Sequence, residues 1–341
     1  MITIKKQNIK NKRLLLDIIS ITIKDYSKMK TLNIGGLIPK LPIIQGGMGI
    51  CVSLSGLASA VANEGGIGVI SAVGIGMIEP NYRRKFRASN KIALTKEIRK
   101  AREKSDGIIG VNIMMAITDF DDLLKIALEE NVDVVFIGAG LFLKKPEMPE
   151  GCTTKFVPKV STARAAQVMF RYWANKYNRV PDAIVVEGPK CGGHVGFKKE
   201  ELLDDQQPLH ELIRETAAII KPFEEQFNIE IPVIAAGGVY TGSDMYEIME
   251  AGANAVKMGT RFVTTHECDV SDEFKQNYIR ATVKDITLID SPVGLPGRVV
   301  SNAFVRKIQA GETMPINCSW KCLKSCDYKK APFCIASALF N

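Results

Sequence analysis

The 341-residue sequence lacks several features that would place it in large classes of protein. No apolar run reaches the roughly 18 residues that a membrane-spanning helix needs, so we expect no membrane segment. Eight cysteines are too few for a disulfide scaffold in a chain of this length, which predicts a reducing, cytoplasmic environment. The glycine fingerprint for binding a dinucleotide is also missing. These absences favour a cytoplasmic globular protein.

The formal net charge of +8 is concentrated at the N-terminus. Residues 1–30 contain eight Lys or Arg and two Asp or Glu, whereas residues 31–341 contain 37 basic and 35 acidic side chains. A nearly neutral body gives no electrostatic reason to expect nucleic acid or a membrane as a partner. We interpret residues 1–30 as a basic N-terminal extension, either a flexible arm or an amphipathic docking helix. Its apolar stretch is short and lacks a small-residue cleavage site, so a secretory signal is not expected.

Segments with strand character alternate with segments of helical character beyond this extension. We predict eight strands, at residues 42–44, 67–70, 110–114, 132–137, 155–160, 183–187, 233–236 and 255–258. We predict helices at residues 54–63, 91–104, 119–130, 163–177, 209–227 and 244–251. Strand–helix alternation predicts parallel strands, and the 46% hydrophobic content suffices for one large core.

Eight such strands favour an α/β fold of the TIM (β/α)8 barrel type over a doubly wound sheet. Residues 74–90 are predicted to form an insertion, either a lid over the strand ends or plain surface. We therefore expect a barrel over residues 31–310 with inserted lid and cap segments, followed by a Cys-rich C-terminal tail at residues 311–341.

One histidine follows a predicted buried strand. Residues 183–187 run into the glycine-rich segment Gly192-Gly193-His194. A strand that ends in such a turn is where α/β barrels present groups that act on a ligand. We predict that His194 is a catalytic proton-transfer group; the alternative is an imidazole that only hydrogen-bonds its own loop.

A second glycine-rich site follows the last two predicted strands. One strand ends in Ala236-Gly237-Gly238 and the next in Met258-Gly259-Thr260. Small residues let backbone N–H groups approach an anion closely, and barrels often bind phosphate at the loops after strands seven and eight. We predict one shared phosphate site, with two ordinary barrel turns as the alternative.

Four motifs in this order resemble the nitronate monooxygenase family, formerly called 2-nitropropane dioxygenases. They are PIIQGGM at residues 42–48, LASAVANEGGIG at residues 57–68, the loop at residues 192–194, and the pair of glycine turns. The family also includes FMN-dependent enoyl-acyl-carrier-protein reductases. The resemblance covers about residues 33–310 and implies a TIM barrel that holds FMN non-covalently at the C-terminal ends of its strands.

The resemblance also implies the residues that contact the cofactor. The phosphate would rest on Gly237, Gly238, Gly259 and Thr260, and the flavin ring would lie against Gly46, Gly47 and Met48. Gln45 and Asn112 would face the polar edge of the ring, and Lys159 would stabilise reduced flavin. Further cofactor-binding positions are Glu187, Gly192, Gly193, Ala236 and Met258. The alternative at each position is packing in the core or in a turn.

The resemblance implies two related activities for a flavin oxidoreductase. As a nitronate monooxygenase, the protein would oxidise alkyl nitronates with oxygen, and His194 would orient the substrate or accept its proton. As an enoyl reductase, it would use NADH or NADPH, and His194 would bind the acyl carbonyl. Glu187 and Cys191 replace the Gln and Ala that we associate with the monooxygenases, which weakens the first assignment. Quinone reduction and a non-catalytic flavin-binding redox partner are further alternatives.

The expected partners follow from these activities: a nitronate or an enoyl thioester, the thioester being free or presented by acyl carrier protein, and a second copy in a homodimer. Residues 291–298 join prolines and glycines to Arg298, which predicts a segment that caps the flavin or binds an anion, or else a surface loop.

The tail contains Cys318, Cys322, Cys326 and Cys334. Four thiolates are a donor set for zinc or an iron–sulfur cluster. Their spacing matches neither common pattern, however, so free or redox-active thiols are the favoured alternative.

Overall fold

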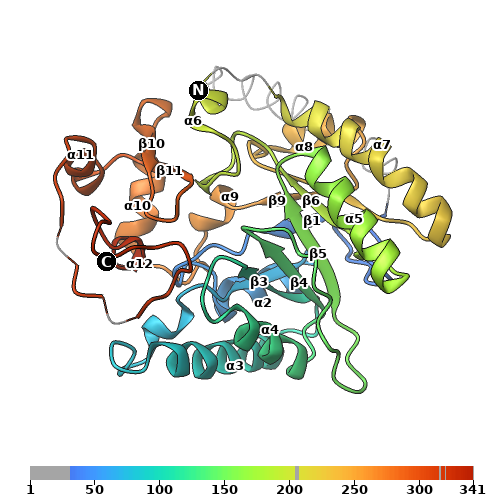
Figure 1. The fold of residues 1–341 in the computed structure, drawn as a ribbon, viewed down its shortest axis with the longest axis horizontal. Helices are drawn as coiled ribbons and strands as arrows, with labels where there is room; N and C mark the ends of the chain where they lie inside the picture. Colours follow the sequence, from blue (N-terminus) through green and yellow to red (C-terminus); the bar gives the residue numbers. More distant parts are fainter. Residues whose placement is uncertain (1–30, 204–206, 315, 319, 341) are drawn as a thin grey trace, which may run out of the picture. The chain divides into compact units, whose positions relative to one another are not determined.

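The computed structural model describes residues 31–203, 207–314, 316–318 and 320–340 (Figure 1). The basic extension predicted at residues 1–30 lies outside the described residues. A compact unit begins at Leu32. Within the described part of the chain, no helix is both long enough and apolar enough to cross a membrane.

Eight parallel strands form the centre of this unit. They are β1 (Ile43–Gln45), β2 (Gly68–Ser71), β3 (Ile109–Met114), β4 (Val134–Gly138), β5 (Lys155–Val160), β6 (Ile184–Glu187), β8 (Val233–Ala236) and β9 (Ala255–Met258). Their hydrogen-bonded order is β1-β9-β8-β6-β5-β4-β3-β2. Two hydrogen bonds of 3.0 Å, from the Gln45 N–H to the Ile67 carbonyl and from the Ile67 N–H to the Ile43 carbonyl, join the two ends of this order. The predicted TIM barrel is therefore confirmed, with strand bounds within two residues of those expected.

The strands are almost wholly buried because side chains fill the barrel and helices cover it. All residues of β2, β4, β8 and β9 are buried, which explains why these strands read as apolar runs rather than as alternating patterns. One core cluster includes Ile44, Val69, Val134, Phe136, Val157, Val185, Ile234 and Ala255. Each valine, isoleucine or phenylalanine side chain among them contributes roughly 1.5–3 kcal/mol on burial.

The helices of the barrel are α2 (Ser55–Asn63), α3 (Phe86–Lys104), α4 (Phe120–Glu129), α5 (Ala163–Tyr177), α7 (Leu209–Phe227) and α8 (Gly242–Glu250). The bounds of α5 and α7 agree with the prediction. Helix α3 begins five residues before the predicted 91, so the segment between β2 and α3 is shorter than expected. It contains the 3-10 helix η1 (Ile75–Ile78), in which Ile75 and Met77 are buried.

Helix α2 depends on a cap from far along the chain. Leu54, at its N-cap, provides no side-chain cap. The Asp269 carboxylate instead accepts hydrogen bonds from the backbone N–H groups of Leu54, Gly56 and Leu57 at 2.8, 3.1 and 3.1 Å. These bonds satisfy donors that every helix leaves unpaired in its first turn.

Short elements that the sequence did not predict form a cap beside the barrel. Strands β10 (Ile286–Asp290), β11 (Pro296–Val300) and β7 (Gly193–His194) make an antiparallel sheet. Figure 1 shows α10 (Asp272–Arg280) and α11 (Ala303–Gln309) near this sheet. The remaining elements are α6 (Lys199–Leu203), α9 (Thr260–Val263), η2 (Val283–Asp285) and α12 (Ile335–Phe340). Strand β11 is important for the site because it pairs directly with the histidine loop.

The C-terminal tail packs on the barrel next to η1 and the start of α3. The Trp320 and Phe86 rings stack with their centroids 5.1 Å apart. The Thr118 N–H donates to the Cys322 carbonyl at 3.0 Å, and Ile117 forms a β-bridge with Leu323. These contacts bring the cysteine-rich segment to the loop between β3 and α4.

Candidate active site

The predicted site residues lie at the carboxyl ends of six barrel strands. Because parallel strands all point the same way, these ends meet on one face of the barrel. The segment Gly46–Met48 follows β1, and the two glycine turns follow β8 and β9; Asn112, Lys159 and Glu187 lie in the second halves of β3, β5 and β6. The fold thus brings together residues that the sequence spreads over more than 200 positions.

The glycines after β1 are required by the packing of the protein itself. A Cβ on Gly47 would lie 2.4 Å from the Asn112 Cβ and 3.0 Å from a Val69 methyl group. A Cβ on Gly46 would lie 3.2 Å from the Met258 carbonyl oxygen. The backbone at the end of β1 therefore approaches β2, β3 and β9 closely, so that Asn112 is held directly beside Gly47.

Gln45 does not have the position that the sequence interpretation expected. Its side chain is buried, its amide oxygen accepts the Val69 N–H at 2.8 Å, and its amide nitrogen donates to the Gly46 carbonyl. These bonds tie β1 to β2 and use the amide for the barrel wall. We therefore assign Gln45 a structural role in place of the predicted contact with a flavin edge.

Two buried polar atoms near Gly47 have no hydrogen-bond partner among the described residues. They are Oδ1 of Asn112 and Oγ of Ser71, which lie on neighbouring strands in register. A buried polar group left without a partner costs about 1–3 kcal/mol. An acceptor and a hydroxyl at the strand ends therefore indicate a place where a polar ligand edge completes the hydrogen bonding.

The turn after β8 has the left-handed backbone that glycine adopts without strain. Gly237 and Gly238 have φ values of +96° and +85°. A Cβ on Gly237 would lie 2.5 Å from the Cys191 sulfur, and one on Gly238 would lie 3.1 Å from the Lys190 Cβ. The loop after β6 thus packs on this turn. Across the other turn, the Met48 sulfur would lie 3.2 Å from a Cβ on Gly259.

Charged side chains form a cluster at the ends of β5, β6 and β9. The Lys159 Nζ lies 2.8 Å from the Glu187 carboxylate, with both side chains largely buried. Glu187 is thus the ion-pair partner of Lys159. This pairing gives a structural reason for a carboxylate at position 187, where we associate the monooxygenases with Gln.

Lys257 in β9 belongs to the same cluster and was not predicted as a site residue. Its side chain is 7% exposed, and its Nζ donates to the Gln45 carbonyl at 3.3 Å and lies 4.0 Å from the centre of the Phe136 ring. Burial and the nearby Lys159 hold the pKa of Lys257 well below its ordinary value. The signal that could have identified Lys257 from the sequence is a lysine inside an otherwise apolar strand.

His194 is held from outside its own loop. Its Nε2 lies 2.7 Å from the Ser291 hydroxyl oxygen, and its backbone pairs with Gly297 of β11. Burial lowers the pKa of His194, so the imidazole is neutral near pH 7 and is able to accept a proton. Nothing lies within 4 Å of a Cβ built on Gly192 or Gly193. There is therefore open space beside these two glycines, which directly precede His194.

Arg298 stabilises the same loop from β11. Its guanidinium donates to the Pro189 carbonyl at 2.8 Å and to the Cys191 carbonyl at 3.3 Å. The sequence interpretation offered an anion-binding or flavin-capping role for Arg298 or a plain surface loop. The structure places it as a clamp on the histidine loop instead. Ser291 was in the same motif, but its pairing with His194 was not anticipated.

The tail cysteines gather around one small cavity. Cys318, Cys322, Cys326 and Cys334 all line a space of about 30 Å³, and all eight cysteines of the chain are free thiols. Burial, with the neighbouring cysteines, raises the pKa of Cys322 to about 12. Among the described residues, no group of three or more Cys, His, Asp or Glu is arranged to hold a metal ion.

The barrel with a histidine loop at its strand ends defines a class, that of (β/α)8 enzymes with a ligand site at the carboxyl face. Comparison with known proteins narrows this class. A profile of the nitronate monooxygenase family matches residues 31–331. The chain belongs to this family of oxidoreductases.

Relatives within and around the family have several names. A probable nitronate monooxygenase of Staphylococcus saprophyticus is 26% identical, with 82% of this chain and 81% of that protein covered. A (3aS,4S,5R,7aS)-5-hydroxy-7a-methyl-1-oxo-octahydro-1H-indene-4-carboxyl-CoA dehydrogenase of Mycobacterium tuberculosis is 27% identical over 79% of this chain. The match spans 66% of the length of that dehydrogenase.

Solved structures show the same architecture. FabK from Thermotoga maritima is 32% identical, with a TM-score of 0.63 and coverage of 80% of this chain and 75% of that one. A nitroalkane oxidase from Streptomyces ansochromogenes has a TM-score of 0.62 at 23% identity, with 79% of each chain covered. The second likeness supports the fold alone.

Proposed function

We propose that the protein is an FMN-dependent oxidoreductase that oxidises alkyl nitronates with oxygen. The observation that carries the cofactor part of this proposal is the buried Asn112 Oδ1, which lacks a donor beside Gly47. A flavin edge offers an N–H group to such an acceptor, and the glycine turns after β8 and β9 suit a phosphate. The acceptor at Asn112 and the backbone donors of the two glycine turns therefore fit FMN.

In this proposal, the residues that hold FMN are those at the carboxyl ends of the strands. The phosphate would be held by Gly237, Gly238, Gly259 and Thr260. The ring would be held by Gly46, Gly47, Met48 and Asn112, with Ala236, Met258, Gly192 and Gly193 around it. When bound, FMN supplies the capacity to accept electrons from the substrate. The Lys159–Glu187 ion pair and the buried Lys257 amine lie at the ends of β5, β6 and β9.

His194 is the proposed proton-transfer residue. Its imidazole is neutral, and Ser291 fixes its orientation. A neutral imidazole can accept a proton from a substrate carbon and return it later. The open space beside Gly192 and Gly193 gives a small substrate room next to this ring.

A second candidate is reduction of an enoyl thioester with NADH or NADPH. It is favoured by the Lys159–Glu187 ion pair, where the monooxygenases that we know carry an uncharged residue. It is also favoured by the relatives named for a CoA thioester and by the 32% identity to FabK. In this reaction, His194 would donate a hydrogen bond to the thioester carbonyl.

The cofactor assignment is tested by Gly238→Asp. The new side chain meets a left-handed backbone and the Lys190 side chain, and its charge repels a phosphate, so we expect loss of FMN from a folded protein. Gly252→Asp is the matched control because Gly252 also has a positive φ, at +114°, but has open space around it. Flavin absorbance per protein and circular dichroism are measured. Retention of stoichiometric FMN in Gly238→Asp would contradict the phosphate site.

The substrate is tested by anaerobic titration of the purified holoprotein with propionate-3-nitronate, NADH and NADPH. We expect the nitronate to bleach the flavin absorbance and oxygen to restore it. Bleaching only by NADH or NADPH, followed by reoxidation with an enoyl-CoA, would establish the second candidate in its place.

A further inference from the structure

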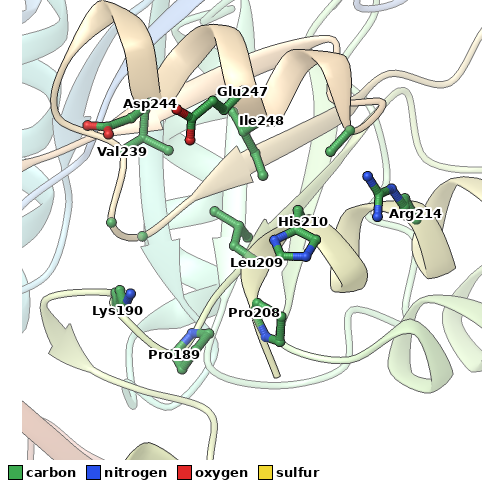
Figure 2. A pocket seen from close by; sticks show the side chains of 13 residues that line it. Pro189, Lys190, Pro208, Leu209, His210, Arg214, Val239, Asp244, Glu247 and Ile248 are labelled. Carbon is green, nitrogen blue, oxygen red and sulfur yellow. The ribbon is translucent and has the colours of Figure 1, made fainter. Parts of the chain in front are cut away.

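A cavity of about 430 Å³ lies between α7 and α8 (Figure 2). Its walls come from the loop after β6, the first two turns of α7, the turn after β8 and one face of α8. The volume lies within the range of roughly 300–1,000 Å³ that is typical of small-molecule sites. Gly237 and Gly238 of the proposed phosphate site are part of its lining, but the proposed function assigns no ligand to the other lining residues.

Three basic side chains line this cavity. Figure 2 shows Lys190 on the loop after β6, and His210 and Arg214 on α7 across the cavity. Arg214 makes no hydrogen bond or ion pair with any described residue, and its side chain is exposed. A guanidinium presents a planar set of donors that matches a phosphate group. The basic residues on these two sides of the cavity therefore suit a phosphorylated ligand.

The side of the cavity formed by α8 has a different chemistry. Asp244 and Glu247 of α8 line the cavity, and Figure 2 shows the Asp244 carboxylate at the N-terminal end of this helix. The Asp244 carboxylate is fixed by the backbone N–H groups of Tyr240 and Thr241, at 3.0 and 2.8 Å. Carboxylates would repel a simple anion but accept hydrogen bonds from sugar hydroxyls or an amino group.

Apolar side chains complete the lining. Leu209 and Ile248 face the cavity from α7 and α8, and Ile248 is itself 6% exposed. Flat aromatic ligands bury their faces against such side chains. The cavity thus combines basic side chains, hydroxyl-accepting carboxylates and an apolar surface, which are the three requirements of a nucleoside phosphate.

We propose that this cavity binds the adenosine phosphate end of a coenzyme that delivers its reactive end to His194. The proposal rests on the second candidate function, reduction of an enoyl thioester with NADH or NADPH, because both a CoA thioester and NAD(P)H have this adenosine end. Lys190 and His194 are four residues apart in one loop, so their Cα atoms lie within roughly 14 Å of each other. An extended pantetheine or dinucleotide can cross that distance from the cavity to the strand ends.

The test measures binding to the purified holoprotein by isothermal titration calorimetry, with adenosine 3′,5′-bisphosphate, adenosine 2′,5′-bisphosphate, AMP and inorganic phosphate as probes. The first represents CoA, the second NADPH and the third NADH. We expect one nucleotide to bind at least tenfold more tightly than phosphate. Arg214→Ala should weaken the binding of that nucleotide about tenfold or more, as expected for loss of a charge-assisted hydrogen bond.

Lys221→Ala is the matched control, since Lys221 is a basic residue on α7 that does not line the cavity; it should change affinity less than twofold. Glu247→Gln should weaken the binding of the nucleotide and leave the binding of phosphate unchanged.

Equal affinity for phosphate and all nucleotides, or no binding by a protein that retains FMN, would overturn the inference and leave the flavin proposal standing. Absence of FMN from the purified protein would instead contradict the proposed function. Loss of FMN from Arg214→Ala would assign the cavity to the flavin and also overturn the inference.

Discussion

At the scale of single residues, the pair formed by His194 and Ser291 has the clearest chemical consequence. A neutral, oriented imidazole is ready to accept a proton, whereas a freely rotating one would lose entropy each time it did so. In the proposed function, Ser291 would therefore be a positioning residue that acts through His194. The two side chains come from segments 97 residues apart.

Replacing His194 with Ala should leave FMN bound and lower turnover about a hundredfold or more, the usual contribution of a positioned acid–base group. Because burial lowers the pKa of His194, turnover of the wild type should be constant near pH 7 and fall only as the pH drops below the ordinary histidine value of about 6.5. Steady-state rates across pH and flavin spectra test both statements. Unchanged turnover in the variant would show that the histidine only supports its loop.

Lys257 illustrates the cost of a buried cation. Its pKa is lowered in the folded protein, so the unfolded chain binds more protons than the folded one at every pH between the two pKa values. The resulting loss of stability is present at pH 7 and disappears as the pH rises past the ordinary lysine value of about 10.4. Lys257→Met should therefore increase the free energy of unfolding by roughly 1–3 kcal/mol at pH 7.

Urea denaturation of wild type and Lys257→Met at pH 7 and pH 10 measures this effect. The difference between the two proteins should shrink at the higher pH. A decrease in stability at both pH values would instead mean that the contacts with Gln45 and Phe136 outweigh the burial of the amine.

At the scale of elements, strand β11 connects the cap to the loop that contains His194. It pairs with Gly193 and His194 on one side, and Arg298 within it donates to two carbonyls of the preceding loop segment. The loop is thus held by a second sheet as well as by the barrel. This arrangement gives the cap a role in the site although it lies outside the barrel.

Arg298→Ala should loosen residues 188–196, because two carbonyl oxygens lose their donors at a cost of about 1–3 kcal/mol. We expect faster backbone hydrogen exchange in this segment and a higher KM. Arg306→Ala in α11 is a suitable control, since Arg306 is an arginine of the cap that makes no hydrogen bond or ion pair with residues 188–196. Unaltered exchange in residues 188–196 would contradict the clamp.

At the scale of the whole molecule, the C-terminal tail is part of the folded unit. Trp320 and Cys322 pack in one apolar cluster with Ile50 and Phe86, so the tail closes over the segment between β2 and α3. The burial that raises the pKa of Cys322 to about 12 and of Cys191 keeps these thiols protonated. Protonated thiols are poor nucleophiles.

Thiol titration with a disulfide reagent at pH 8 should therefore detect fewer than the eight cysteines in the native protein and all eight in guanidinium chloride. Mass spectrometry of the alkylated protein should find Cys322 and Cys191 among the protected residues. Zinc or iron at one equivalent in protein prepared without oxygen would revive the metal-site alternative. Rapid reaction of Cys322 would contradict its burial.

The sequence by itself predicted the barrel, because buried parallel strands and amphipathic helices are local patterns with distinct periods. It also points to the strand ends proposed as the site, since Gly237 and Gly238 follow β8 directly and His194 lies in the loop after β6. What it missed depends on contacts between distant segments. Asp269 caps α2 from 215 residues away, so no capping signal precedes that helix, and Gln45 binds Val69 rather than the open face of the site.

The partners of the charged and polar groups were likewise decided only by the tertiary structure. Lys159 and Glu187 are 28 residues apart, and Ser291 reaches His194 only because β10, β11 and β7 form one sheet. Local sequence patterns determine which residues form strands and helices, because those preferences act over a few neighbours. Which side chains meet, and with what pKa, is decided by packing between strands and loops that closure of the barrel brings to one face.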